Sequence, residues 1–169
     1  MRKVIMNLAV SLDGFIEGPN GEIDWCFTDQ DYGMKEFFKS IDAIFIGRKS
    51  YELMKKMGGN PFPSNKYYIF SRTLKQADQG EEIISNDFEQ QVQNIKNTPG
   101  KNIWLFGGAS LISAFINARL VDEFMISVHP VLLGKGKPLF CDIDERTALK
   151  FSRAETYSSG LVQLFYSLK

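Results

Sequence analysis

The chain has 169 residues, 44% of them hydrophobic, and its 20 lysines and arginines balance 20 aspartates and glutamates, so its formal net charge is zero. This length predicts a single domain, residues 1–169, with a sizeable buried core. The charge balance excludes the polybasic surface that drives binding to nucleic acid or to an anionic membrane. Two separate cysteines and a single histidine exclude a structural zinc site, so no metal is expected.

The first two-thirds of the sequence alternates between apolar runs and helical patterns. Residues 4–10 form a nearly continuous apolar run, which is typical of a strand buried on both faces. A glycine-rich loop follows at residues 13–29, and a loop of that length in a compact domain indicates a functional role. The next expected elements are, in chain order, a helix at 34–41, a strand at 41–46, a helix at 48–57, a strand at 67–70, a candidate strand at 83–84, a helix opened by a capping box at 86–89, a strand at 102–106 and a helix at 111–116.

The last fifty residues have a different pattern. Apolar residues alternate at 124–128 and again at 162–168, and a Ser-Ser-Gly turn at 158–160 joins the final strand to the one before it. Parallel β–α units followed by antiparallel strands predict an α/β fold with a mixed central sheet flanked by helices. No segment approaches the length that spans a membrane, and two lone thiols are typical of a reducing compartment, so we expect a cytoplasmic protein.

Two junctions of strand, glycine and helix carry the main functional signal. The apolar strand at residues 103–106 leads into the glycine pair 107–108 and a helical run, and residues 44–47 lead in the same way into a cationic helix start at 48–50. Glycine lets a ligand approach the backbone closely, and the free amides at a helix start attract anions. Two such junctions in one small domain indicate a dinucleotide with a diphosphate. The alternative is a pair of tight turns with solvated cations, although the helix dipole disfavours cations at that end.

Five motifs occur in an order that resembles the dihydrofolate reductase-like superfamily, and within it the C-terminal reductase domain of bacterial riboflavin-biosynthesis proteins and its stand-alone relatives. The motifs are AVSLDGFI at 9–16, GRKSYE at 47–52, SR at 71–72, FGGA at 106–109 and PVLLGKG at 130–136, so the resemblance covers nearly the whole chain. It implies a three-layer α/β/α fold whose mixed central sheet has about eight strands, mainly parallel with antiparallel C-terminal strands. It also implies an NADPH-dependent oxidoreductase, often a homodimer, that acts on a small-molecule substrate.

The resemblance further implies which residues bind the cofactor. The helix start at Arg48 would contact the cofactor's phosphates and the strand end at Arg72 its adenosine 2′-phosphate, which favours NADPH over NADH, because guanidinium groups suit phosphate contacts. An ordinary surface arginine is the alternative for Arg72. Family members have a cis peptide within the glycine pair, and their nicotinamide lies beside the first strand. The expected cofactor-binding residues are Ala9, Leu12, Asp13, Gly14, Gly47, Arg48, Lys49, Ser50, Phe70, Ser71, Arg72, Phe106, Gly107, Gly108, Ala109, Ser110 and Leu111.

At the proton donor, the sequence departs from the folate-reducing members. Those members carry a carboxylate on the first helix, and here Met34 occupies that position, with Asp31 one turn earlier. The departure argues against dihydrofolate as the substrate and leaves the catalytic residue unassigned. The expected substrate-binding residues are Asp24 and Trp25, the latter as a stacking surface, together with Asn7 on the first strand. A turn residue for Asp24 and a hydrogen-bonded core residue for Asn7 are the alternatives.

Three functions remain open at this point. The first is an NADPH-dependent reductase of a pyrimidine- or pteridine-like heterocycle, similar to the 5-amino-6-(5-phosphoribosylamino)uracil reductase of riboflavin biosynthesis. The second is a dihydrofolate reductase-like enzyme with a relocated proton donor, and the third is an NADPH-binding module without chemistry. We expect His129 to be a structural, hydrogen-bonded histidine rather than a general base, Cys26 to be a buried thiol, and the loop at 134–138 to be structural and near a dimer interface.

Overall fold

The computed structural model describes residues 1–169 and has a central eight-stranded sheet with the order β5-β4-β3-β6-β1-β7-β10-β9. Neighbouring strands from β5 to β7 are parallel, and β10 pairs antiparallel with both β7 and β9. The mixed sheet with antiparallel C-terminal strands is therefore confirmed. The elements are β1 (Val4–Ser11), β2 (Phe15–Glu17), α1 (Met34–Ser40), β3 (Ile41–Gly47), α2 (Arg48–Lys56), β4 (Lys66–Phe70), β5 (Glu82–Ile84), α3 (Phe88–Lys96), β6 (Asn102–Gly107), α4 (Ala109–Asn117), β7 (Glu123–His129), β8 (Lys137–Pro138), β9 (Leu149–Thr156) and β10 (Val162–Leu168).

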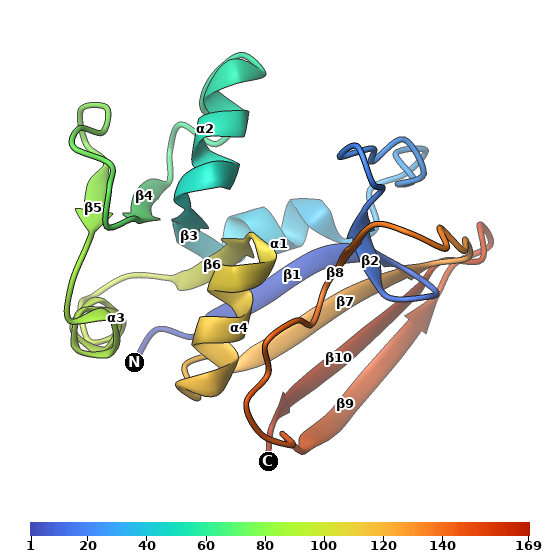
Figure 1. The fold of residues 1–169 in the computed structure, drawn as a ribbon. Coiled ribbons are helices and arrows are strands. Elements are labelled where there is room, and N and C mark those ends of the chain that lie inside the picture. Colours follow the sequence, from blue (N-terminus) through green and yellow to red (C-terminus); the bar gives the residue numbers. More distant parts are fainter.

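Helices cover both faces of the sheet, which makes the molecule three layers thick (Figure 1). On one face α3 and α4 pack on the strands, and Phe45 and Phe115 are fully buried there. On the other face α1 and α2 contribute Phe37 and Tyr51 to a second core that includes Trp104 of β6. Because both faces of the parallel strands are covered, their sequences are continuous apolar runs. No helix is both long and apolar enough to cross a membrane.

The expected elements lie close to their predicted bounds, and the start of α3 shows the main local difference. The predicted capping box at 86–89 is wrong, because no side chain caps this helix. Asn86 instead accepts two hydrogen bonds from Gln91 Nε2, one at its carbonyl oxygen (2.8 Å) and one at Oδ1 (2.9 Å). The helix begins after Asp87, whose φ of 45° lies in the left-handed region. The side-chain oxygen of Asn86 thus accepts from the Gln91 side chain rather than from a backbone amide of the helix.

A second sheet of two short strands lies beyond the carboxyl end of β1 (Figure 1). It pairs β2, within the glycine-rich loop, antiparallel with β8, within the loop that follows β7, and it places Glu17 opposite Lys137. Neither strand was predicted, since strands of three and two residues are too short to show alternation. The loop at 134–138 pairs with the glycine-rich loop through these two strands.

Candidate functional site

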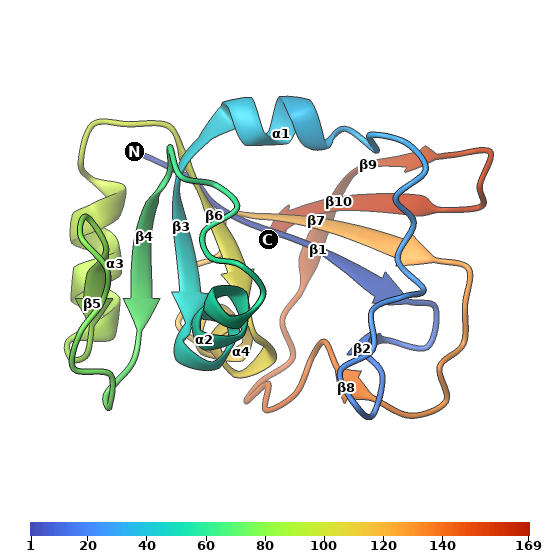
Figure 2. The same cartoon turned by 90° about the horizontal axis from the view of Figure 1, so that it is seen from above.

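A hollow of about 690 Å³ opens at the carboxyl edge of the parallel strands. Figure 2 shows that α2 and α4 both begin at this edge, beyond the tips of β3 and β6. In open α/β sheets ligands bind outside the carboxyl ends of the strands. Eleven of the expected cofactor-binding residues line the hollow, namely Gly47, Arg48, Lys49, Ser50, Phe70, Ser71, Arg72, Gly108, Ala109, Ser110 and Leu111.

The hollow is strongly positive. Its lining includes a single carboxylate, that of Asp87, and four cations: Arg48, Lys49, Arg72 and Lys137. Arg48 contacts Glu52, with Nη1 3.4 Å from Oε1, whereas neither Lys49 nor Arg72 forms an ion pair. An anion in this hollow would therefore meet positive charge that the protein does not neutralise internally.

Backbone amides add to this positive charge. Helix α2 begins at Arg48 directly after Gly47, and α4 begins at Ala109 directly after Gly108. No side chain caps either helix, and neither helix has an acidic residue in its first turn. The first amides of both helices are thus left without side-chain acceptors, which is the condition for an anion site at a helix start.

The two glycine junctions are in contact with each other. A Cβ built on Gly47 would lie 3.5 Å from the carbonyl oxygen of Gly107 and 3.6 Å from the amide nitrogen of Gly108. The peptide between Gly107 and Gly108 is cis, as the family resemblance implied. A Cβ on Gly108 would lie 3.3 Å from Ser50 Oγ, and its absence keeps the space beside that hydroxyl free. The sequence prediction that both junctions serve one site agrees with this geometry.

Sequence reasoning missed part of the lining. The turn from β5 to α3 contributes Ser85, Asn86 and Asp87, and β8 contributes Lys137. For the three residues after β5, the only signal in the sequence was the candidate strand at 83–84, because the carboxyl end of a parallel strand lies at the same edge of the sheet. The run GKGKP at 134–138 resembles a phosphate-binding loop but lacks the strand and helix of a P-loop, and the position of Lys137 depends instead on the pairing of β8 with β2.

Six of the expected cofactor residues lie outside the lining of the hollow: Ala9, Leu12, Asp13, Gly14, Phe106 and Gly107. The Asp13 carboxylate accepts hydrogen bonds from Ser11 Oγ (2.6 Å) and from the amides of Leu133 (3.1 Å) and Gly134 (2.7 Å). The bond from Ser11 is the first cause of a lowered pKa for this carboxyl. Asp13 thus ties the glycine-rich loop to the loop before β8, while Leu12 is 64% exposed.

The face of β1 beneath α1 holds the region where the substrate is expected. Asn7 is 4% exposed, and its Nδ2 lies 3.6 Å from Met34 Sδ while its carbonyl oxygen accepts a hydrogen bond from Trp104 Nε1 (2.9 Å). Four aromatic rings surround Trp104 with centroid separations between 4.9 and 5.7 Å, those of Phe37, Phe38, Phe62 and Phe106. The Asp31 carboxylate accepts the amide of Lys35 (3.1 Å) near the start of α1. No carboxylate takes the place of Met34.

Asp24 and Trp25 lie on the glycine-rich loop, and Trp25 packs against His129 of β7. The Trp25 ring stands edge-on to the His129 imidazole with a centroid separation of 5.3 Å, and its Nε1 donates to the carbonyl oxygen of Glu22 (3.2 Å). Asp24 is exposed and forms no hydrogen bond. Burial and the charge of Asp24 raise the pKa of the Cys26 thiol to about 11, so Cys26 is an unreactive thiol at neutral pH.

Comparison with known proteins identifies the family. The family model of the RibD C-terminal domain matches residues 2–163. The chain belongs to this family. It is 48% identical to the Bacillus subtilis (strain 168) protein YyaP over 177 residues, which covers 98% of this chain and 94% of YyaP.

Solved structures agree with the RibD C-terminal fold of the chain. A candidate riboflavin biosynthesis protein from Shewanella sp. PV-4 superposes with a TM-score of 0.86 at 24% identity, covering 100% of this chain and 99% of the other. Dihydrofolate reductase from Enterococcus faecalis, complexed with NADP(H) and RAB-propyl, superposes with a TM-score of 0.68 at 16% identity, covering 99% of this chain and 96% of the other. The dihydrofolate reductase-like fold and its RibD-type branch are thus shown.

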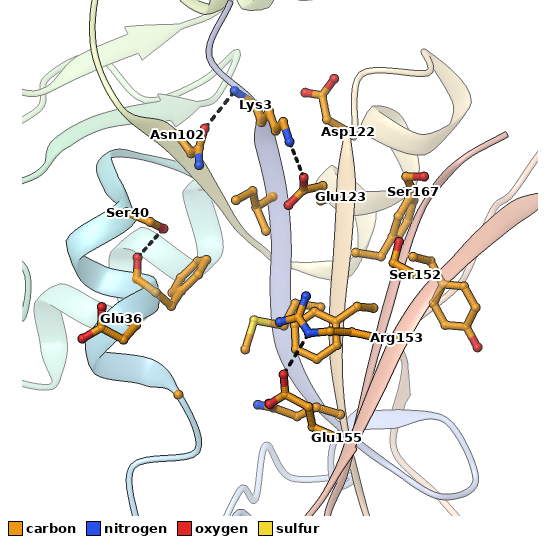
Figure 3. A pocket seen from close by; sticks show the side chains of 18 residues that line it. Lys3, Glu36, Ser40, Asn102, Asp122, Glu123, Ser152, Arg153, Glu155 and Ser167 are labelled. Carbon is orange, nitrogen blue, oxygen red and sulfur yellow. Dashed lines mark hydrogen bonds and ion pairs between the residues drawn. The ribbon is translucent and has the colours of Figure 1, made fainter.

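A second hollow of the RibD-type domain, about 870 Å³, lies on the sheet face between α1 and the hairpin of β9 and β10 (Figure 3). None of the expected cofactor or substrate residues lines it. Its two cations are already paired, because Lys3 Nζ lies 2.6 Å from Glu123 and Arg153 Nε lies 2.8 Å from Glu155. The larger hollow therefore offers no unpaired positive charge to a dinucleotide, and the positive hollow at the carboxyl edge of the strands is the better site for one.

His129 is a structural histidine, as predicted. It is 3% exposed, its Nδ1 lies 3.0 Å from the carbonyl oxygen of Ser127, and its Nε2 accepts the amide of Phe27 (3.1 Å). These contacts use both nitrogens of a neutral imidazole, and burial lowers its pKa below the ordinary value of 6.5.

The lowered pKa of His129 predicts a loss of stability in acid. Below pH 6.5 the unfolded chain binds a proton at this imidazole that the folded chain does not bind, so the free energy of unfolding falls as the pH falls through 6.5 toward the folded pKa. Urea unfolding at pH values of about 7.5 and about 5.5 should show a larger loss for the wild type than for His129→Gln, by up to about 1.4 kcal/mol per pH unit. Equal losses for the two proteins would contradict this assignment.

Proposed function

We propose that the chain is an NADPH-dependent reductase that transfers hydride to a small, flat heterocycle of the pyrimidine or pteridine type. The observation that carries the proposal is the positive hollow, where two uncapped helix starts meet beside Gly108. Amides and cations together neutralise a dinucleotide diphosphate, and the glycine leaves it room. The NADP(H) bound to the Enterococcus faecalis reductase supports the same choice of cofactor.

The residues present suit the parts of NADPH. Arg72 has no ion pair and would bind the adenosine 2′-phosphate together with Ser71, whose Oγ already accepts the amide of Leu74 (2.9 Å) and whose hydroxyl proton stays available. Arg48 and Ser50 at the start of α2 would hold the diphosphate. When bound, the nicotinamide supplies the hydride, and the protein supplies binding, orientation and exclusion of water.

The region beneath α1 would receive the substrate. The half-buried rings of Phe38, Phe62 and Phe106, which flank the buried Trp104, would offer a flat, apolar surface to a heterocycle. The Asn7 amide has only the Met34 thioether as a partner, which is a weak acceptor, so the amide is available to a substrate carbonyl. Dihydrofolate is the less suitable substrate because Met34 replaces the expected acid and the Asp31 carboxylate is bonded to the amide of Lys35.

The proposal predicts substrate-dependent oxidation of NADPH. Purified protein should consume NADPH when aminopyrimidine riboside phosphates or pterins are supplied, and Asn7→Ala should lower kcat/KM by about tenfold without changing NADPH affinity, since one hydrogen bond to substrate is lost. Turnover of dihydrofolate alone would favour the relocated-donor enzyme. Tight NADPH binding with no oxidation across the panel would show a binding module instead and would refute the reductase.

A further inference from the structure

Lys137 reaches the hollow from a part of the fold that has no other contact with it. Its Nζ lies 3.7 Å from the point that a Cβ on Gly108 would occupy, and Ser50 Oγ lies 3.3 Å from the same point. The ammonium group, the hydroxyl and the side-chain-free glycine therefore mark one position at the start of α4. A phosphate group at that position would have donors on both sides.

The β2–β8 ribbon determines where Lys137 lies. A Cβ on Gly136 would come within 2.2 Å of the carbonyl oxygen of Glu17, so only glycine allows the two strands to approach this closely. The amide of Leu139 donates to the carbonyl oxygen of Gly14 (2.9 Å), which fixes the ribbon on its other side. Lys137 is thus held by backbone contacts that do not involve its own side chain.

The Lys137 ammonium has one partner within the protein. Glu17 Oε1, from the opposite strand of the ribbon, lies 3.2 Å from Nζ, and the two side chains are 31% and 43% exposed. An ion pair that is open to solvent contributes little to stability. Its exchange for a contact with a phosphate, which carries more charge and more acceptors, is favourable.

We propose that Lys137 binds the diphosphate of the dinucleotide and that Glu17 competes with the diphosphate for it. The inference rests on the proposed function and adds a regulatory element to the same site. When the dinucleotide binds, Lys137 exchanges Glu17 for a phosphate oxygen, and β2, which belongs to the glycine-rich loop, loses one of its ties to β8. Cofactor binding and the state of that loop are thereby coupled, and Glu17 lowers the affinity of the resting protein.

Titrations of full-length variants with NADPH and NADH test the inference. Lys137→Gln should lower the affinity for both nucleotides equally, by about ten- to a hundredfold, because both contain the diphosphate and one charge-assisted contact with it is lost. Lys137→Arg should retain affinity within about threefold. Glu17→Gln should raise the affinity for both nucleotides by about three- to tenfold. This gain should disappear in the double variant Glu17→Gln/Lys137→Gln, because the ammonium group for which Glu17 and the diphosphate compete is then absent.

Lys135→Gln is the matched control, since Lys135 is exposed on the same loop and does not line the hollow. It should leave both affinities unchanged, and thermal melts should show that all variants are folded. An unchanged affinity in Lys137→Gln, or weaker binding in Glu17→Gln, would overturn the inference while the proposed function stands. A loss confined to NADPH would also overturn it, because Lys137 would then act at the 2′-phosphate. If the wild type bound neither nucleotide, the proposed function itself would fail.

Discussion

Replacing Arg48 and Arg72 together by glutamine is expected to weaken NADPH binding by at least about a hundredfold and NADH binding by about tenfold. Each charge-assisted contact with phosphate contributes about 1.5–3 kcal/mol, and about 1.4 kcal/mol corresponds to a factor of ten. Both arginines line the positive hollow, but NADH has no 2′-phosphate for Arg72 to bind. Fluorescence titration with the two nucleotides measures the difference.

The single variants separate the two roles. Arg72→Gln should weaken NADPH alone, whereas Arg48→Gln should weaken both nucleotides. Arg146→Gln provides the control, because Arg146 is exposed and lies outside the hollow. An equal loss for NADPH and NADH in Arg72→Gln would show that this arginine does not recognise the 2′-phosphate.

Replacing Gly108 by valine is expected to remove NADPH binding while the fold persists. Gly108 has φ −78° and ψ −164°, a backbone conformation open to any residue. The added side chain would point at Ser50 Oγ, 3.3 Å from its Cβ, and into the space that the diphosphate requires. A clash of this kind costs about 1–3 kcal/mol or more, which corresponds to a loss of affinity of at least about fivefold and up to about a hundredfold or more. The melting temperature should stay within about 4 °C of the wild-type value.

Gly107→Ala is the matched variant, and it should lower the stability of the fold, which Gly108→Val should leave nearly unchanged. Gly107 has φ +107°, which is unfavourable for a side chain, and its Cβ would lie 3.2 Å from Ile112 Cδ1 in the core. This variant should lose about 1–3 kcal/mol of stability. Unchanged NADPH affinity in Gly108→Val would show that the glycine pair does not border the bound cofactor, independently of the result for Gly107→Ala.

The sequence predicts those features of the fold and site that arise from local patterns. Continuous apolar runs identify β1, β3 and β6 because both faces of these strands are buried. The glycines at 47 and 108 predict the location of the hollow, because parallel strands that end in helix starts bring their carboxyl ends to one edge. This is why most of the predicted phosphate-binding residues lie together in the structure.

Features that depend on distant contacts escape sequence reasoning. Asp13 has the local appearance of a turn residue, yet its carboxylate binds amides some 120 positions away, at Leu133 and Gly134. The pairing of β2 with β8 brings Lys137 to Gly108, and neither strand is long enough to show a pattern. The predicted cap at Asn86 is wrong, since the helix begins after Asp87 and the Asn86 side-chain oxygen accepts from Gln91, one turn into the helix. For Asp13 and Lys137 the deciding partner lies far away in the sequence, whereas for Asn86 it lies five residues away and competes for the same oxygen.

The most direct measurement is a parallel titration of the wild-type protein with NADPH and with NADH, followed by fluorescence and by thermal unfolding. A ligand at a hundredfold excess over its dissociation constant stabilises the folded state by about 2.7 kcal/mol, which raises the melting temperature of a domain of this size by about 5–10 °C. We predict such a shift with NADPH and a clearly smaller one with NADH at the same concentration. The absence of a shift with either nucleotide would contradict the assignment of the positive hollow to a dinucleotide, and with it the reductase.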